Sequence, residues 1–215
     1  RWTSAAWALQ GTGMAWLGLR QQRRVVRWSG LALLVFASGA WMLSLLHGPF
    51  DRQDGFLLNG HALNLGLLAL AFLASSFLYM RAGASRWLQV LLFLAGLGWW
   101  ALLGFREIGI NLAPRYDALA YAGFALVTAA IAAALRKPLV WPRLSWPVAI
   151  PVVMLLPLSL AAQDHYDTNF FDWPLLLWWP LLLGALLTLR ALRHPRSLGL
   201  VFAHLAWLLA VAIAG

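Results

Sequence analysis

The chain has 215 residues, of which 62% are hydrophobic and 11% are charged, with a formal net charge of +9 at pH 7 and no cysteine. A soluble domain carries roughly 25% charged residues, so this composition excludes an ordinary soluble globular protein, and the lack of cysteine excludes disulfides and thiolate chemistry. The basic residues lie in short segments beside apolar runs, where arginines set membrane topology and meet lipid headgroups, so we expect no nucleic-acid partner.

Eight runs of 17 or more residues contain no Asp, Glu, Lys or Arg. A helix needs about 20 apolar residues to cross the hydrocarbon core of a bilayer, and a helix satisfies its own backbone hydrogen bonds in lipid. We therefore expect an all-α, polytopic transmembrane helical bundle of about eight spans, forming a single domain over 1–215. In chain order the runs cover Trp2–Leu19, Trp28–Phe50, Gly55–Met80, Trp87–Phe105, Ala118–Leu135, Leu144–Gln163, Trp173–Leu189 and Ser197–Gly215.

The segments between the runs alternate in charge. Every second segment is basic and holds no acid: Arg20/Arg23/Arg24/Arg27, Arg81/Arg86, Arg136/Lys137/Arg143 and Arg190/Arg193/Arg196. The intervening segments hold all seven acids: Asp51, Asp54, Glu107, Asp117, Asp164, Asp167 and Asp172. Because Lys and Arg favour the cytoplasmic side, the pattern predicts four antiparallel helical hairpins with basic cytoplasmic turns and both termini on the non-cytoplasmic side.

The centres of the runs are almost free of ionisable groups. Ion-coupled transporters usually carry a charged side chain inside the membrane, so the absence of Asp, Glu, Lys and Arg from the centres of these runs argues against an ion-coupled transporter. Several runs contain glycine pairs, Gly11 with Gly13 and Gly96 with Gly98. Glycine lets neighbouring membrane helices approach closely, and we expect it to do so here.

Polar side chains gather in the segments assigned to the outer face. The carboxylates with the best prospects for catalysis are Asp51, Glu107 and Asp117, and the candidates for substrate binding are Arg106, Arg115, Asp164, His165, Asp167 and Asp172. Glu107 and Asn111 are four residues apart and share one helical face. Arg106 and Arg115 either pair with Glu107 and Asp117 or clamp a phosphate or carboxylate. The simpler interpretation is that these are ordinary polar residues of outer turns.

Metal and cofactor chemistry has little support in the sequence. His165 and its neighbouring aspartates offer ligands for a divalent cation, but their spacing matches no metal motif, and we expect neither a metal site nor a cofactor. No nucleophile elbow or phosphate-binding loop is present in the sequence.

Scattered segments resemble a bacterial family of polytopic membrane proteins, the one catalogued as domain of unknown function 2339. The resemblance rests on Trp7–Gly11 with Trp16–Arg24, Phe56–Gly60, Gly98–Trp100 with Arg106-Glu107, Pro114–Tyr116 and His204–Trp207. It covers most of the chain and implies a fragment of a longer, multi-pass protein of the bacterial inner membrane. It implies no catalytic residues.

Three functions fit these observations. The first is the handling of a lipid-linked, glycan or other anionic substrate at the outer, periplasmic face. The alternative is a structural or scaffold subunit of a membrane complex, and the second alternative is a transporter of a small molecule. The expected partners are the lipid bilayer, other membrane subunits and, for the first function, that substrate; whether the protein is an enzyme stays open.

Overall fold

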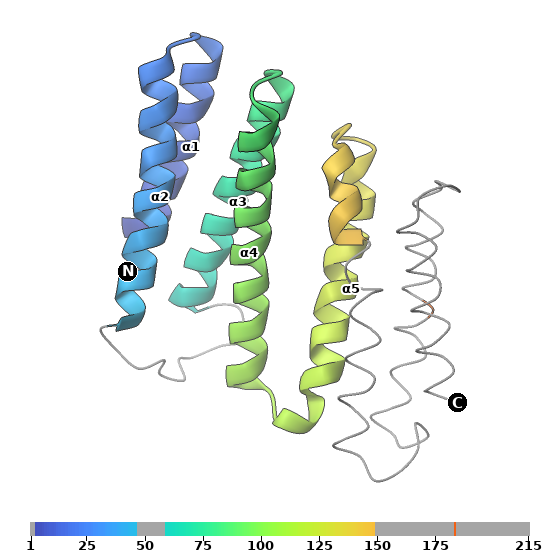
Figure 1. Ribbon diagram of the computed structural model, residues 1–215. Helices are drawn as coiled ribbons and strands as arrows, with labels where there is room; N and C mark the ends of the chain where they lie inside the picture. The colour runs from blue at the N-terminus through green and yellow to red at the C-terminus, as the bar shows by residue number, and fades with distance from the viewer. Residues whose placement is uncertain (1–2, 47–58, 149–182, 184–215) are drawn as a thin grey trace. The chain divides into compact units, whose positions relative to one another are not determined.

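The computed structural model describes residues 3–46, 59–148 and 183, and within these ranges every regular element is a helix (Figure 1). The all-α prediction is confirmed for this part of the chain. The elements are α1 (Thr3–Arg20), α2 (Arg24–Leu46), α3 (Gly60–Arg81), α4 (Arg86–Asn111), the 3₁₀ turn η1 (Pro114–Tyr116), α5 (Asp117–Arg136) and the 3₁₀ turn η2 (Pro142–Leu144).

Four of the described helices are long and apolar enough to cross a membrane, namely those over Arg24–Ser44, Gly60–Arg81, Arg86–Asn111 and Asp117–Arg136. The helix α1, with 18 residues, is not among them. Its buried face consists of small or polar residues such as Ser4, Gly11 and Gly18, which contribute little hydropathy. Beyond Val148, the predicted spans over Leu144–Gln163, Trp173–Leu189 and Ser197–Gly215 lie outside the described residues apart from Leu183.

The chain divides into two compact units, Arg1–Asn111 and Leu112–Gly215. In the first unit α1 packs against α2, α3 packs against α4, and α1 also packs against α3. Each of the two pairs is antiparallel, with its connecting turn at the same end of the unit (Figure 1). The indoles of Trp41 in α2 and Trp99 in α4 meet edge to face, with ring centroids 5.3 Å apart, so this unit has one core shared by its helices.

The helices α1 and α2 approach so closely that only glycine fits at their contact. A Cβ atom on Gly30 would lie 2.6 Å from the backbone nitrogen of Ala15 and 2.6 Å from the carbonyl oxygen of Gly11. A Cβ on Gly11 would in turn lie 2.7 Å from the carbonyl oxygen of Gly30. Small residues at such contacts allow extensive van der Waals packing between membrane helices.

Buried hydroxyl and amide groups join α1 to α3. The Ser4 hydroxyl and the Asn64 side-chain amide exchange hydrogen bonds of 2.7 and 3.1 Å. Further along the helices, the Thr12 hydroxyl lies 3.2 Å from that of Ser75 and donates to the Ala71 carbonyl oxygen at 3.0 Å. Buried hydrogen bonds of this kind join two packed helices, which explains how α1 remains packed against α3 despite its modest hydropathy.

Ser4→Ala should lower the free energy of unfolding by about 0.6 kcal/mol and by no more than about 1.7 kcal/mol, the range for such bonds between membrane helices. Ser38→Ala is the matched control, because the Ser38 hydroxyl donates to the Leu34 carbonyl of its own helix. The measurement is equilibrium unfolding of both variants in the same bicelles. Equal losses in the two variants would contradict an interhelical role for Ser4.

Three turns in the described residues end a helix in the same way. In each, the turn residue has positive φ, namely Gln22 (54°), Gly83 (62°) and Val140 (50°). Each turn residue donates its backbone N–H to the carbonyl oxygen three residues earlier, and the residue after it donates to the carbonyl oxygen five residues earlier. The first kind of bond joins Gln22 to Leu19, Gly83 to Met80 and Val140 to Lys137. The second kind joins Arg23 to Gly18, Ala84 to Tyr79 and Trp141 to Arg136. This pair of bonds is the Schellman motif, which normally has glycine at the left-handed position.

Val140→Gly should raise the stability of the protein by about 1 kcal/mol. A β-branched residue at positive φ is strained, the left-handed conformation costs roughly 1–2 kcal/mol for a residue with a Cβ, and the Val140 side chain, 70% exposed, loses little packing on removal. The control is Val127→Gly, a similarly exposed position within α5, where glycine should lower stability because it is a poor helix former. Thermal unfolding in detergent would compare them, and a loss of stability in both variants would contradict the prediction.

Candidate functional site

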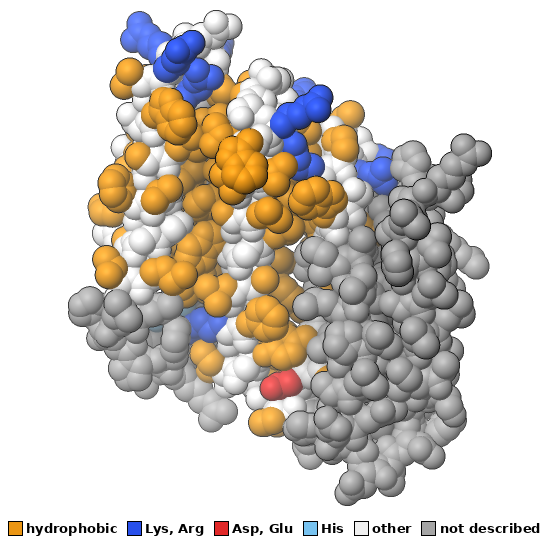
Figure 2. Space-filling view, in the orientation of Figure 1, with side chains coloured by type: hydrophobic (Ala, Val, Ile, Leu, Met, Phe, Trp, Pro, Cys, Tyr) orange, Lys and Arg blue, Asp and Glu red, His pale blue; other side chains and the backbone are white. Residues whose placement is uncertain are grey.

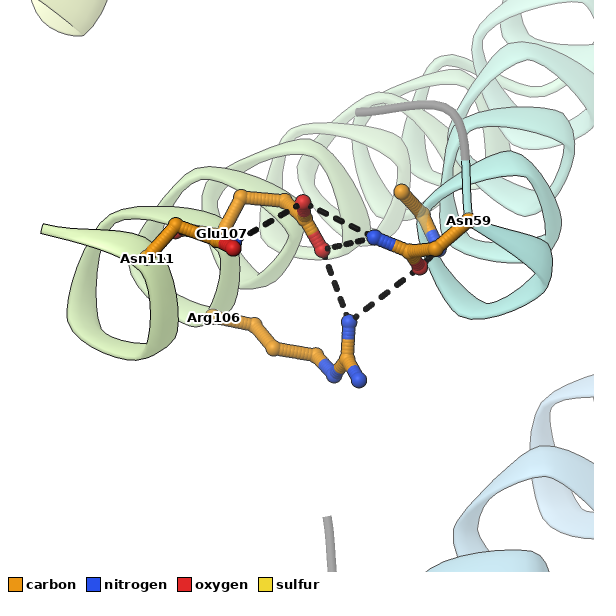
Figure 3. Close-up of polar contacts among 5 residues, drawn as sticks. Asn59, Arg106, Glu107 and Asn111 are labelled. Carbon is orange, nitrogen blue, oxygen red and sulfur yellow. Dashed lines mark hydrogen bonds and ion pairs between the residues drawn. The ribbon is translucent and has the colours of Figure 1, made fainter. Parts of the chain in front are cut away.

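A cluster of polar side chains joins the start of α3 to the end of α4 (Figure 3). Asn59 immediately precedes α3. The last turns of α4 contribute Arg106, Glu107 and Asn111. The Glu107 side chain is 1% exposed and that of Arg106 is 7% exposed. A charge so thoroughly removed from water requires a compensating partner, and Arg106 supplies it, with its Nη1 atom 2.7 Å from Glu107 Oε1.

Both oxygens of the Glu107 carboxylate accept hydrogen bonds. Oε1 accepts from Asn59 Nδ2 at 3.0 Å and from Arg106 Nη1 at 2.7 Å. Oε2 accepts from Asn59 Nδ2 at 3.0 Å and from Asn111 Nδ2 at 3.4 Å. The carboxylate is therefore surrounded by donors from its own chain, an arrangement that leaves little room for a substrate.

Asn59 has two roles at once. Its Oδ1 atom accepts the backbone N–H of Ala62 at 2.8 Å and so caps the first turn of α3, as Asn commonly does. Its amide nitrogen donates to Glu107 in α4. The same side chain thus fixes where α3 begins and holds that point against α4.

The depth of this Asn59–Glu107 cluster follows from helical geometry. Glu107 lies 21 positions after Arg86, the first residue of α4, which at 1.5 Å per residue is about 31 Å along the axis. The hydrocarbon core of a bilayer is about 30 Å thick. With Arg86 at one membrane surface, the cluster lies at the level of the opposite surface, where headgroups begin.

The remaining predicted site residues are not brought together in the described structure. Asp117 is the first residue of α5, in the second unit, and among the described residues its buried Oδ1 atom has no hydrogen-bond partner. Arg115 lies in η1, where its side chain is not described. Asp51, Asp164, His165, Asp167 and Asp172 lie outside the described residues, and so does the cation site considered at His165. A binding role for any of these residues stays a prediction.

Within residues 3–46 and 59–148, no group of three or more His, Cys, Asp or Glu side chains comes together as ligands for a metal ion. The contacts within the Asn59–Glu107 cluster are a salt bridge and the hydrogen bonds around it.

By the length and composition of four of its helices, this is a helical membrane protein. In comparisons with known proteins, no family model, curated protein or solved structure matches the chain.

Proposed function

We propose that the chain is a structural membrane domain that holds its helices in a fixed arrangement for other membrane subunits, and that the Arg106–Glu107 pair serves this purpose. The observation that supports this role is the complete internal pairing of the buried Glu107 carboxylate with Asn59, Arg106 and Asn111. A carboxylate that acts as an acid, a base or a substrate ligand needs an approach from outside its own helices. The exposed apolar side chains of α1 to α5 are then available to lipid and to partner helices.

The buried polar groups of the first unit also favour a structural role over transport. Ser4 bonds to Asn64, Thr12 bonds to α3, and the Ser76 hydroxyl donates to the Gln89 carbonyl at 2.7 Å. Each of these groups has a partner on a neighbouring helix. A transport path needs polar groups that a solute can reach, whereas these groups are engaged in holding helices together.

We further propose the full topology of eight spans as four antiparallel pairs, with basic turns in the cytoplasm, both termini outside, and the inner membrane of a bacterium as location. The recurrence of one turn geometry at Gln22, Gly83 and Val140, each next to basic residues, supports this repeat. In this proposal the chain is one domain of a longer protein, and its resemblance to the family of domain of unknown function 2339 stays part of the proposal.

A second candidate function is the handling of a lipid-linked, glycan or other anionic substrate at the outer face. The observation in its favour is Asp117, whose buried Oδ1 atom has no hydrogen-bond partner among the described residues. A carboxylate in that state is available as an acid or base, and the arginine two residues earlier, Arg115, supplies a charge for an anionic group.

Complementation of a deletion host by Glu107→Gln and Asp117→Asn separates the two functions, with the membrane abundance of each variant measured in parallel. A structural role predicts that growth or envelope integrity follows abundance in both variants. Loss of function with normal abundance in Asp117→Asn would favour the substrate-handling function. The same result in Glu107→Gln would overturn the structural role of the Arg106–Glu107 pair.

A further inference from the structure

One end of the first unit carries a concentrated positive charge. Its six arginines flank the α1–α2 and α3–α4 turns: Arg20, Arg23, Arg24, Arg27, Arg81 and Arg86. The packing of α1 on α3 brings the two turns to the same end, where Figure 2 shows Lys and Arg side chains gathered. No Asp or Glu precedes residue 51, and the one salt bridge found among the described residues is at Arg106–Glu107, near the opposite ends of α3 and α4.

Exposed tryptophans lie at the same level as these arginines. Trp16, Trp28 and Trp87 are 46%, 62% and 68% exposed, and each is within four residues of an arginine of this end, or about 6 Å along a helix. The Arg20 guanidinium lies over the Trp16 ring, 5.8 Å from its centroid. Indole rings with this exposure belong at the boundary between headgroups and acyl chains, so the surface is cationic at its tip and apolar directly beneath.

Arg27 lies against α1 at this end. It is half-buried, and its backbone nitrogen and Cγ atom lie so close to Gly18 that a Cβ there would approach them to 2.6 and 2.7 Å. The position of Arg27 is therefore set by its contacts with α1, whereas Arg23 and Arg24 are exposed beside it.

We propose that this six-arginine end binds the phosphate of anionic phospholipids, and that Arg23, Arg24 and Arg27 around the α1–α2 turn take part in the binding. A lipid satisfies both parts of the surface, because its phosphate neutralises the arginines while its acyl chains cover the tryptophans. Clusters of four to eight basic residues next to membrane helices have this preference. A nucleic acid or a free phosphate would meet the charge and leave the apolar band unused.

The test uses the purified full chain in nanodiscs of phosphatidylcholine with increasing phosphatidylglycerol, with bound lipids counted by native mass spectrometry. The variant is Arg23→Gln/Arg24→Gln/Arg27→Gln. The control is Arg136→Gln/Lys137→Gln/Arg143→Gln, which removes three basic residues around the turn after α5. Circular dichroism checks that both variants remain helical.

We expect the wild type and the control to retain phosphatidylglycerol in preference to phosphatidylcholine. Each basic residue of a cluster of four to eight near a membrane surface contributes roughly a fivefold preference for anionic lipid, so the triple arginine variant should lose most of that preference. The three basic residues removed in the control fall short of such a cluster. Equal retention of the two lipids by the wild type would overturn the proposal, as would an equal loss in the control. Displacement of the lipid by millimolar inorganic phosphate or by a short RNA would show that charge alone is recognised, which would also overturn it.

Discussion

Glu107→Ala should be the most damaging single substitution among the described residues, with a loss of about 3–5 kcal/mol in the free energy of unfolding, the usual cost of breaking a buried ion pair. The substitution leaves the Arg106 guanidinium, 7% exposed, without its counter-charge, and it removes the acceptor of the Asn59 amide. The start of α3 then loses its polar link to the end of α4. Steric trapping in bicelles measures this free energy without extrapolation from denaturant.

The matched control is Asp117→Ala, which removes the other carboxylate of the described residues. Asp117 lies in the first turn of α5, where an acid typically contributes about 0.3–1 kcal/mol, and no more than about 2 kcal/mol, through the helix dipole. In a double-mutant cycle, the loss of stability in the Asn59→Ala/Glu107→Ala variant should be smaller than the sum of the losses in the two single variants, because the two residues share one interaction. Comparable losses for Glu107→Ala and Asp117→Ala would show that the cluster does not stabilise the unit.

Gly30→Ala should have the second largest effect, a loss of about 1–3 kcal/mol, the typical cost of an added methyl group in a close-packed contact. The added Cβ would lie 2.6 Å from backbone atoms of both Gly11 and Ala15. Backbone cannot rotate out of the way as a side chain can, so α1 and α2 must separate. The expected observations are a lower unfolding temperature in detergent and weaker protection of α1 from proteolysis.

The control for this substitution lies on the same helix. Gly39→Ala makes the same chemical change in α2 at a position with no atom within 4 Å of the new Cβ. It should be neutral or slightly stabilising, because alanine is the better helix former. If both variants unfold at the same temperature, the close approach of α1 and α2 does not limit stability.

Much of the Asn59–Glu107 cluster could be predicted from local spacing alone. Arg106 and Glu107 are adjacent, and Glu107 and Asn111 are one helical turn apart, so the sequence pointed to three of the four residues. Asn59 could not be assigned in this way, because its partner lies 48 positions away. The predicted third span began at Gly55, so Asn59 fell inside it, whereas α3 begins at Gly60 with Asn59 as its cap. An Asn followed by a helical run is a capping signal that would have corrected this boundary.

Only one glycine of each predicted pair lies close to a neighbouring helix. Gly11 and Gly96 do lie against neighbouring helices, whereas a Cβ added to Gly13 or Gly98 would have no neighbouring atom within 4 Å. Two residues along a helix turn a side chain by about 200°, so only one glycine of each pair can face a given neighbour. Choosing between them requires knowledge of the helix packing, as does finding Gly30, the partner of Gly11.

The proposed topology makes the claim that the chain crosses a membrane repeatedly with its basic turns on one side. Because the chain has no cysteine, single cysteines introduced at exposed positions can be labelled without background. We predict that a membrane-impermeant maleimide modifies Gln21→Cys, Ala82→Cys and Pro138→Cys in inside-out vesicles and Ala113→Cys in right-side-out vesicles. Labelling of Ala113→Cys from the same side as Ala82→Cys would contradict the claim, because α4 would then not span the membrane.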